Sequence, residues 1–186
     1  MRGPLMLGGG IIYGGVFLGV FVTYGLATLM SEENCAALRG STIAFYTDGE
    51  TFGPLNEALA KARHRGIHTV VRIVPEAVMH SDRKWERIAA AQNLQVQMAA
   101  LSGASFHTMM PDQVYNDCFF PRLMDLATRH RNIVHNGLNA QRTCAVDLQV
   151  YRQSDGSLII PARDLNDTAW KHMHNRMLVM NGFDLG

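Results

Sequence analysis

Cysteine is scarce in this chain, and the few residues present lie far apart. Only Cys35, Cys118 and Cys144 occur among the 186 residues. Three scattered cysteines do not provide the framework of a small disulfide-stabilised domain or the ligand set of a zinc site. One disulfide bridge with a third, free thiol is compatible with this count, so the sequence leaves the pairing of the three open.

An excess of charge of one sign is also lacking. The chain carries 17 Lys and Arg residues against 16 Asp and Glu residues, which gives a formal net charge of +1. Domains that bind nucleic acid usually show a marked basic excess, so we expect no nucleic-acid partner. Internal repeats and low-complexity tracts are absent as well, which excludes solenoid and other repeat architectures.

Charged residues are absent from the whole stretch between Arg2 and Glu32. Within it, GGGIIYGGVFLGVFVTYGLATLM (residues 8–30) exceeds the roughly 20 apolar residues that span a bilayer as a helix. A cleaved signal peptide has a shorter apolar region, although small residues near the end of the run keep cleavage as an alternative. The sequence therefore predicts a transmembrane helix with a short tail in residues 1–31, a juxtamembrane linker in 32–40 and a soluble domain in 41–186.

Small residues recur at a spacing of four along this apolar run. Gly10 and Gly14 form one such pair, and Gly15, Gly19, Thr23 and Ala27 form a second series that continues without a break. Small side chains at this spacing let two helices approach closely within lipid, where packing rather than hydrophobic exclusion drives association. Glycine is common in membrane helices in general, but the unbroken spacing favours a helix-packing face. The expected partners are lipid and other transmembrane helices of a membrane complex.

Beyond the apolar run, turn residues and periodicity predict alternating strands and helices. Strands are expected at 41–49 and 67–75, a hairpin at 143–162, and helices at 51–66, 81–103, 118–137 and 164–182. The strand, helix, strand unit predicts parallel pairing. The whole order predicts a small α/β or α+β domain with helices packed on a mixed sheet. The turn YTDGETFG after the first expected strand lacks a glycine-rich phosphate-binding pattern, which argues against a nucleotide enzyme.

Few side chains in the soluble domain suggest chemistry. Asp48 and Glu50 follow a predicted strand, where α/β proteins often bind ligands, although an exposed acidic turn explains them equally well. His172 and His174 are two residues apart and would point to opposite sides of a helix, so they are expected to be solvated rather than metal ligands. No serine or cysteine nucleophile with a recognisable base emerges. We therefore expect no catalytic residue, metal or cofactor.

Two short segments resemble families of known activity. RHRNIVHNG (residues 129–137) resembles the arginine-to-histidine motif of HEPN ribonucleases. That resemblance implies that Arg129 and His135 meet across a dimer at an RNA backbone, with His130 as the polar neighbour. It also implies an all-helical bundle, from which the predicted strands depart.

The second segment, CAVDLQVYRQSDGSLIIPARD, looks like the zinc-dependent D-Ala-D-Ala peptidase family. Asp147 would match the zinc-binding aspartate of that family. The position seven residues earlier is Ala140 rather than histidine, His135 is too far back, and the terminal Glu-x-x-His motif is missing. Zinc catalysis needs three protein ligands and an open position. The resemblance therefore implies at best a degenerate, membrane-tethered hydrolase.

Together these features predict a non-catalytic, single-pass accessory or structural subunit of a larger membrane protein complex. It would dock through the glycine-rich helix face. The layout alone suggests an energy-transducing complex of the mitochondrial inner membrane, with a bacterial cell envelope as the alternative location. The alternative function is the membrane-tethered, zinc peptidase-like hydrolase.

Overall fold

The structure is a computed structural model that describes residues 5–74, 84–129 and 143–173. The chain forms two compact units. The first, which we call the sheet unit, comprises Met1–Leu26 and Cys35–Val114. The second, which we call the C-terminal unit, comprises Ala27–Asn34 and Tyr115–Gly186.

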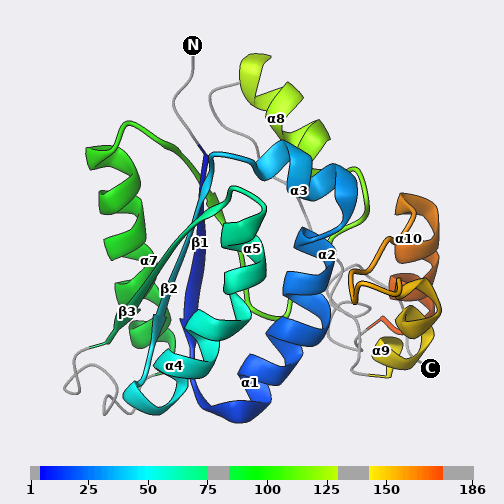
Figure 1. The fold of residues 1–186 in the computed structure, drawn as a ribbon, viewed down its shortest axis with the longest axis horizontal. Coiled ribbons are helices and arrows are strands. Elements are labelled where there is room, and N and C mark those ends of the chain that lie inside the picture. Colours follow the sequence, from blue (N-terminus) through cyan, green and yellow to red (C-terminus); the bar gives the residue numbers. More distant parts are fainter. Residues whose placement is uncertain (1–4, 75–83, 130–142, 174–186) are drawn as a thin grey trace, which may run out of the picture. The chain divides into compact units, whose positions relative to one another are not determined.

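A parallel sheet organises the sheet unit (Figure 1). Its strands are β1 (Leu5–Ile12), β2 (Thr42–Thr47), β3 (His68–Ile73) and β4 (Ser105–Thr108). They lie in the order β3-β2-β1-β4, and each neighbouring pair is parallel. The predicted α/β class is confirmed, and the four described strands form a parallel rather than a mixed sheet.

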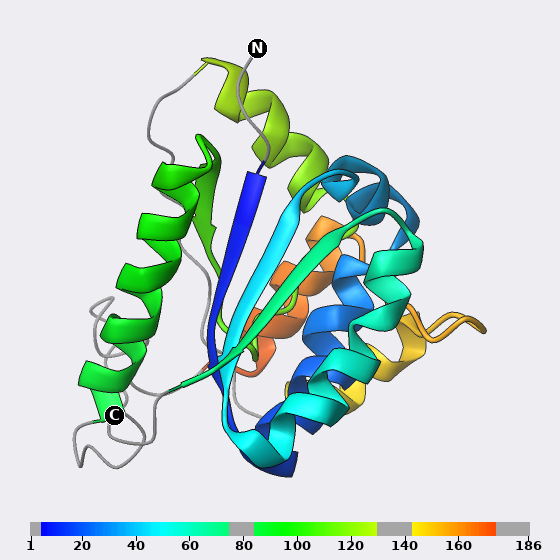
Figure 2. The same ribbon diagram turned by 60° about the vertical axis from the view of Figure 1, so that its left-hand side comes forward.

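Helices cover both faces of this sheet. They are α1 (Gly14–Val20), the π-helix η1 (Phe21–Leu26), α4 (Gly49–Ala58), α5 (Ala60–His64) and α7 (Lys84–Leu101). The helix α3 (Glu32–Leu38) begins in the C-terminal unit and ends in the sheet unit. Figure 2 shows α4 and α5 on one face of the sheet and α7 on the other. Phe21 of η1 packs edge-on against Phe45 of β2, with ring centroids 4.8 Å apart. The arrangement is that of a doubly wound α/β sheet.

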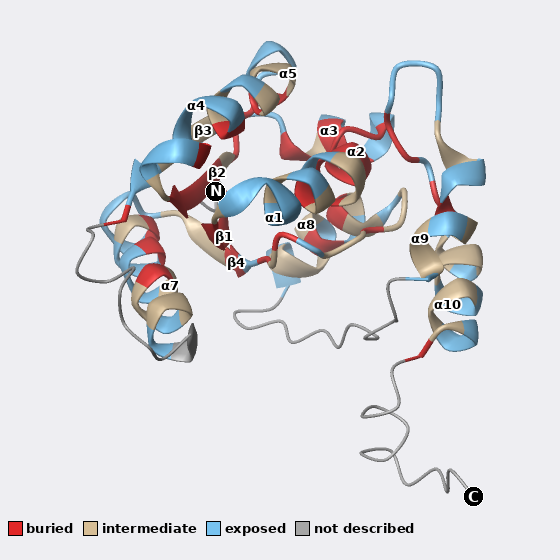
Figure 3. Ribbon diagram, turned by 90° about the horizontal axis from the view of Figure 1, so that it is seen from below, coloured by how far each residue is buried: buried red, intermediate tan, exposed pale blue. Residues whose placement is uncertain are grey.

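The N-terminal apolar run is not one helix. Its first part forms β1, in which all eight residues from Leu5 to Ile12 are buried (Figure 3). A strand covered on both faces reads as a continuous apolar run, and hydropathy does not distinguish such a run from part of a membrane helix. Among the described residues no single helix is long and apolar enough to span a membrane. The bent pair Gly14–Leu29 and Glu32–Leu38 meets that criterion only when both helices are taken together.

Two glycines of β1 allow aromatic rings to lie directly on the strand backbone. A Cβ atom added to Gly9 would overlap the ring of Phe45, and one added to Gly8 would overlap the ring of Phe106. Glycine in a strand often marks such a close approach. Close packing on glycine therefore occurs here inside the sheet unit, between a strand and its neighbouring side chains.

A β-bulge interrupts the pairing of β1 with β2. Gly8 pairs with Ala44 but Ile11 pairs with Tyr46, so β1 contains one extra residue, and Gly10 has φ +64°. The fully buried side chain of Gln95, on α7, fills the gap. Its Oε1 accepts from the Gly10 amide at 3.3 Å, and its Nε2 donates to the carbonyls of Gly10 at 3.4 Å and Ala44 at 2.9 Å. The carboxamide thus satisfies backbone groups that the bulge leaves unpaired.

The C-terminal unit is built from short helices. They are α2 (Ala27–Leu29), α8 (Phe119–Arg129), α9 (Cys144–Asp147), the 3-10 helix η2 (Leu148–Tyr151) and α10 (Ala162–Lys171). Of the predicted hairpin, the turn at residues 154–156 is present, with an antiparallel bridge between Arg152 and Leu158, but residues 144–151 are helical rather than a strand. The bulky, apolar Leu148 and Leu158 are buried, which fits short helices as well as strands.

Asn34 is the polar centre of this unit. Its side chain is fully buried. Its Nδ2 donates to the carbonyls of Thr28 at 3.1 Å and Asn116 at 2.7 Å, while its Oδ1 accepts from the Phe120 amide at 3.0 Å. One amide side chain therefore joins three separate backbone segments.

Candidate functional site

The strand order reverses at β1. The chain passes from β1 to β2 and β3 in one direction, and then returns to place β4 on the other side of β1. In open α/β sheets, ligands bind outside the carboxyl ends of the strands at such a switch point. The residues at this edge are those that follow β1 and β4, around Tyr13 and Met109.

A hydrogen-bond network fixes the turn between β1 and α1. Gly14 has φ +68°, a conformation that favours glycine. Its amide donates to Thr51 Oγ1 at 2.9 Å and to Asp48 Oδ2 at 3.3 Å. Asp48 also caps α4, because its Oδ1 accepts from the Thr51 amide at 2.6 Å. Asp48, which the sequence placed at a strand end near a ligand, thus holds the starts of two helices together, and Glu50 lies exposed in the first turn of α4.

A buried hydroxyl lies beside this turn. Thr47, the last residue of β2, is fully buried and is paired in register with Ile12. Within the described part of the chain, its Oγ1 has no hydrogen-bond partner. A buried unpaired hydroxyl destabilises a fold, and such groups often mark a place where a ligand or water binds.

An aromatic ring and a cation meet at the same edge. Tyr13, which is half-buried, follows β1 and lies 5.1 Å from the ring of Phe17. The guanidinium carbon of Arg87, on α7, is 5.9 Å from the centroid of the Tyr13 ring. This distance allows a cation–π interaction and places positive charge beside the β1–α1 turn. No local sequence pattern indicates this pair, because its members are 74 positions apart.

The residues of the predicted glycine face fall on several elements. Gly10 is in β1, Gly14, Gly15 and Gly19 are in α1, Thr23 is in η1, and Ala27 is in α2. Gly15 and Gly19 are exposed, and a Cβ atom added to either meets no described atom within 4 Å. Ala27 is buried. The six residues therefore do not form one continuous stripe on a single helix.

Exposed apolar side chains lie close to Gly15 and Gly19 in the chain. Val16 is 67% exposed, Val22 39% and Phe17 36%. We call the surface formed by Gly15, Val16 and Gly19 of α1 and Val22 at the start of η1 the open face of α1, since helical spacing places these four residues on one side. It is uncharged, since none of its members ionises.

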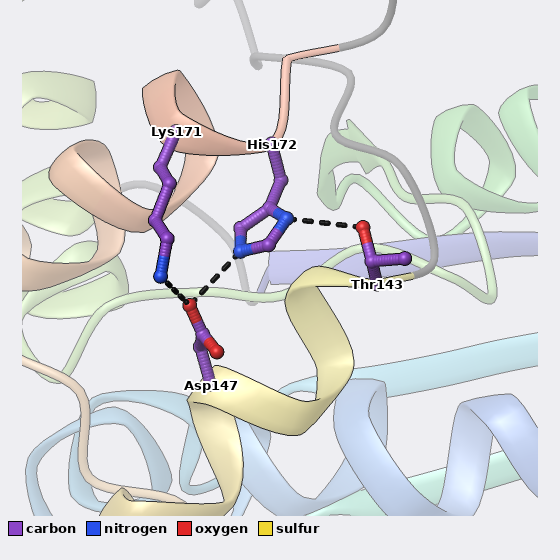
Figure 4. Close-up of polar contacts among 4 residues, drawn as sticks. All are labelled: Thr143, Asp147, Lys171 and His172. Atoms are coloured by element: carbon purple, nitrogen blue, oxygen red, sulfur yellow. Dashed lines mark hydrogen bonds and ion pairs between the residues drawn. The ribbon is translucent and has the colours of Figure 1, made fainter.

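A second polar cluster lies within the C-terminal unit (Figure 4). His172 Nε2 lies 2.9 Å from Asp147 Oδ2, and His172 Nδ1 lies 3.0 Å from the hydroxyl of Thr143. Lys171 Nζ donates to the same Asp147 oxygen at 2.7 Å. Hydrogen bonds from Lys171 and then from His172 lower the pKa of Asp147. His172, expected to be solvated, has a side chain only 16% exposed.

The other residues noted in the sequence form no site among the described residues. His130, His135, Ala140 and His174 lie outside the described residues. Arg129 ends α8 and forms an ion pair with Asp125. Among the described residues, no group of three or more histidine, cysteine or acidic side chains could hold a metal ion.

The three cysteines are free thiols. Cys35 is buried, and burial raises its pKa. Cys118 is exposed and Cys144 is half-buried. The sequence left their pairing open, and the structure forms no disulfide among them.

Comparisons with known proteins assign no family. No family model matches the chain, and no curated protein or solved structure matches it. The site geometry is therefore the basis for function.

Proposed function

We propose that the sheet unit binds a small phosphate-bearing ligand, such as a nucleotide, at the carboxyl end of β1. The reversal of strand order at β1 carries this proposal, because ligands of open α/β proteins bind at that point. The sequence argues against a nucleotide enzyme because the turn after the strand expected at 41–49 lacks a glycine-rich pattern, but that strand is β2 rather than the first strand. The first strand is β1, and the pair Gly14–Gly15 follows it after one residue, Tyr13.

The start of α1 supplies the chemistry that an anion needs. The first amide groups of a helix have no partner within the helix and carry a partial positive charge. The Gly14 amide is bound by Asp48 and Thr51, whereas Gly15 and Val16 follow it on exposed positions. Phosphate groups bind readily at such helix starts. Arg87 adds a full positive charge at the same edge.

Binding of pyrophosphate and ADP to the purified chain, measured by isothermal titration calorimetry, tests this proposal. Gly15→Asp would place a carboxylate beside the free amides and is expected to abolish binding. Gly19→Asp is the matched control, because Gly19 is equally open but lies one turn further along the helix. Failure of the unchanged chain to bind either probe, or equal binding by the Gly15→Asp variant, would overturn the proposal.

A second function is favoured by the open face of α1. Its two glycines and two valines are exposed, and such surfaces commonly bind other proteins or membranes. On this reading the protein is an accessory subunit that docks α1 into a larger membrane complex. The mitochondrial inner membrane and the bacterial envelope stay the proposed locations.

Native gels and alkaline carbonate extraction of membranes from the source cells test this second function. Gly19→Leu is expected to release the chain from its complex while leaving binding of pyrophosphate intact. If the unsubstituted chain migrates alone on the native gel, that result would contradict docking. The two functions are thus separated by one variant.

A further inference from the structure

The C-terminal unit contains a hydroxyl, an imidazole and a carboxylate joined in series. Thr143 precedes α9, Asp147 ends α9, and His172 follows the last residue of α10 (Figure 4). His172 follows Thr143 by 29 positions and Asp147 by 25 positions in the chain, and the fold brings the three side chains together. This cluster lies apart in sequence from every residue of the phosphate site proposed above.

The two hydrogen bonds select one tautomer of the neutral imidazole. The carboxylate of Asp147 only accepts, so Nε2 of His172 carries the hydrogen at 2.9 Å from Oδ2. In the neutral ring Nδ1 is then an acceptor, and the Thr143 hydroxyl donates to it at 3.0 Å. A nucleophile bonded to a base, with the base oriented by a third group, is the general arrangement of an activated hydroxyl.

We propose that Thr143 is the nucleophile of an acyl-transfer site, with His172 as its general base and Asp147 as the residue that positions His172. The substrate class is an ester or thioester of a carboxylic acid. The Thr143 residue is exposed, so an acyl group can reach its hydroxyl, while the imidazole behind it is largely sheltered from solvent. This site is independent of the phosphate site in the sheet unit.

The reaction balances within these groups and the substrate. Thr143 Oγ1 bonds to the carbonyl carbon as its proton passes to His172 Nδ1, and the carbonyl electron pair moves onto oxygen. That pair then returns, the bond to the leaving alcohol or thiol breaks, and His172 gives the leaving group its proton. Water, deprotonated by His172 in the same way, then releases the acid and restores the Thr143 hydroxyl.

The neighbouring groups favour Thr143 over its nearest competitor. Burial, and next the negative charge of Asp147, raise the pKa of the Cys144 thiol. A protonated thiol is a poor nucleophile. Lys171 bonds to the same oxygen of Asp147 as His172 does, which keeps that carboxylate ionised and fixed in place.

Labelling of the full chain with p-nitrophenyl acetate, followed by peptide mass mapping, tests the proposal. We expect an acetyl group on the side chain of residue 143 in the unchanged chain and in the Thr143→Ser variant, and none at that position in the Thr143→Ala variant. In His172→Gln the rate of labelling at Thr143 should fall about a hundredfold, the usual contribution of a general base. His64→Gln, which removes an exposed histidine of α5, should leave the rate unchanged.

The role of Asp147 needs a separate readout, because its loss could also loosen α9. Asp147→Asn should slow labelling at Thr143, and Asp147→Glu should restore part of the rate. Acetylation confined to Lys171 or Cys144 would overturn the proposal. So would an unchanged labelling rate at Thr143 in the His172→Gln variant with an intact circular dichroism spectrum.

Discussion

Within each of the two units of this chain, a different kind of interaction stabilises the fold. In the sheet unit, four strands pair through their backbones, and aromatic rings pack on glycines of the central strand. In the C-terminal unit, Arg152 and Leu158 form an isolated β-bridge, and side chains such as Asn34 and Asp147 join the segments. Backbone pairing tolerates changes of side chain as long as space is kept. Side-chain cross-links instead depend on the identity and the charge of single residues.

The sheet unit should therefore be most sensitive to added volume at β1. Gly9→Ala is expected to lower the free energy of unfolding by about 3 kcal/mol, because the new Cβ would overlap the ring of Phe45. Urea unfolding followed by circular dichroism measures this change. The double variant with Phe45→Leu should recover part of the loss, because the two side chains compete for one space.

Gly15→Ala is the matched control for this first prediction. Gly15 lies in α1 with open space around it, so alanine there should stabilise the helix by about 0.5–1 kcal/mol. Equal effects of Gly9→Ala and Gly15→Ala would show that ring packing on β1 does not limit the stability of the sheet unit.

In the C-terminal unit the largest effect should come from a polar residue. Asn34→Ala removes three hydrogen bonds and leaves buried backbone groups of Thr28, Asn116 and Phe120 without them. At about 1 kcal/mol for each bond, the loss should be about 3 kcal/mol. Hydrogen exchange read by mass spectrometry should show faster exchange in α8 and little change in β1. Asn166→Ala, at an exposed position of α10, should have no such effect.

Gln95 is the exception that sharpens the comparison, since it is a polar cross-link inside the sheet unit. Gln95→Leu introduces an apolar side chain of similar size. It leaves the amide and carbonyl of Gly10 and the carbonyl of Ala44 without this hydrogen-bond partner. The expected loss is about 2 kcal/mol, since two of the three bonds are long. Gln97→Leu, exposed on the same helix, should change the urea midpoint little. Equal midpoints for both variants would mean that the bulge does not need Gln95.

The sequence predicted the elements whose signals are local. The strand expected at 41–49 is β2, the one expected at 67–75 is β3, and the helix expected at 81–103 is α7. Each has a turn residue at its end and a periodicity of its own. β1 was missed because a strand buried on both faces has the hydropathy of a membrane helix. β4 was missed because it is short and partly polar.

The candidate sites were less accessible to sequence analysis than the fold. Asp48 was placed correctly at the end of a strand, since a local pattern marks that position. The contacts of Tyr13 with Arg87 and of Thr143 with His172 depend on residues far apart in the chain. Helical spacing predicts a solvated side chain for His172. Its position just after α10, turned toward α9, depends on tertiary packing that no helical periodicity encodes.

The smallest expected effect is the loss of the stabilisation by Asp147 at acid pH. Asp147 has a lowered pKa in the folded chain, so its contribution to stability is complete above the ordinary carboxyl pKa of 3.8. That contribution disappears as the pH falls through the lower, folded pKa, because the protonated carboxyl no longer pairs with Lys171 and His172. Hydrogen exchange in α10 should therefore be slower in the unchanged chain than in Asp147→Asn near neutral pH, and the difference should vanish in acid. A difference that persists in acid would mean that the side chain of Asp147 joins α9 to α10 through its packing rather than its charge. Charged cross-links would then not distinguish the C-terminal unit from the sheet unit.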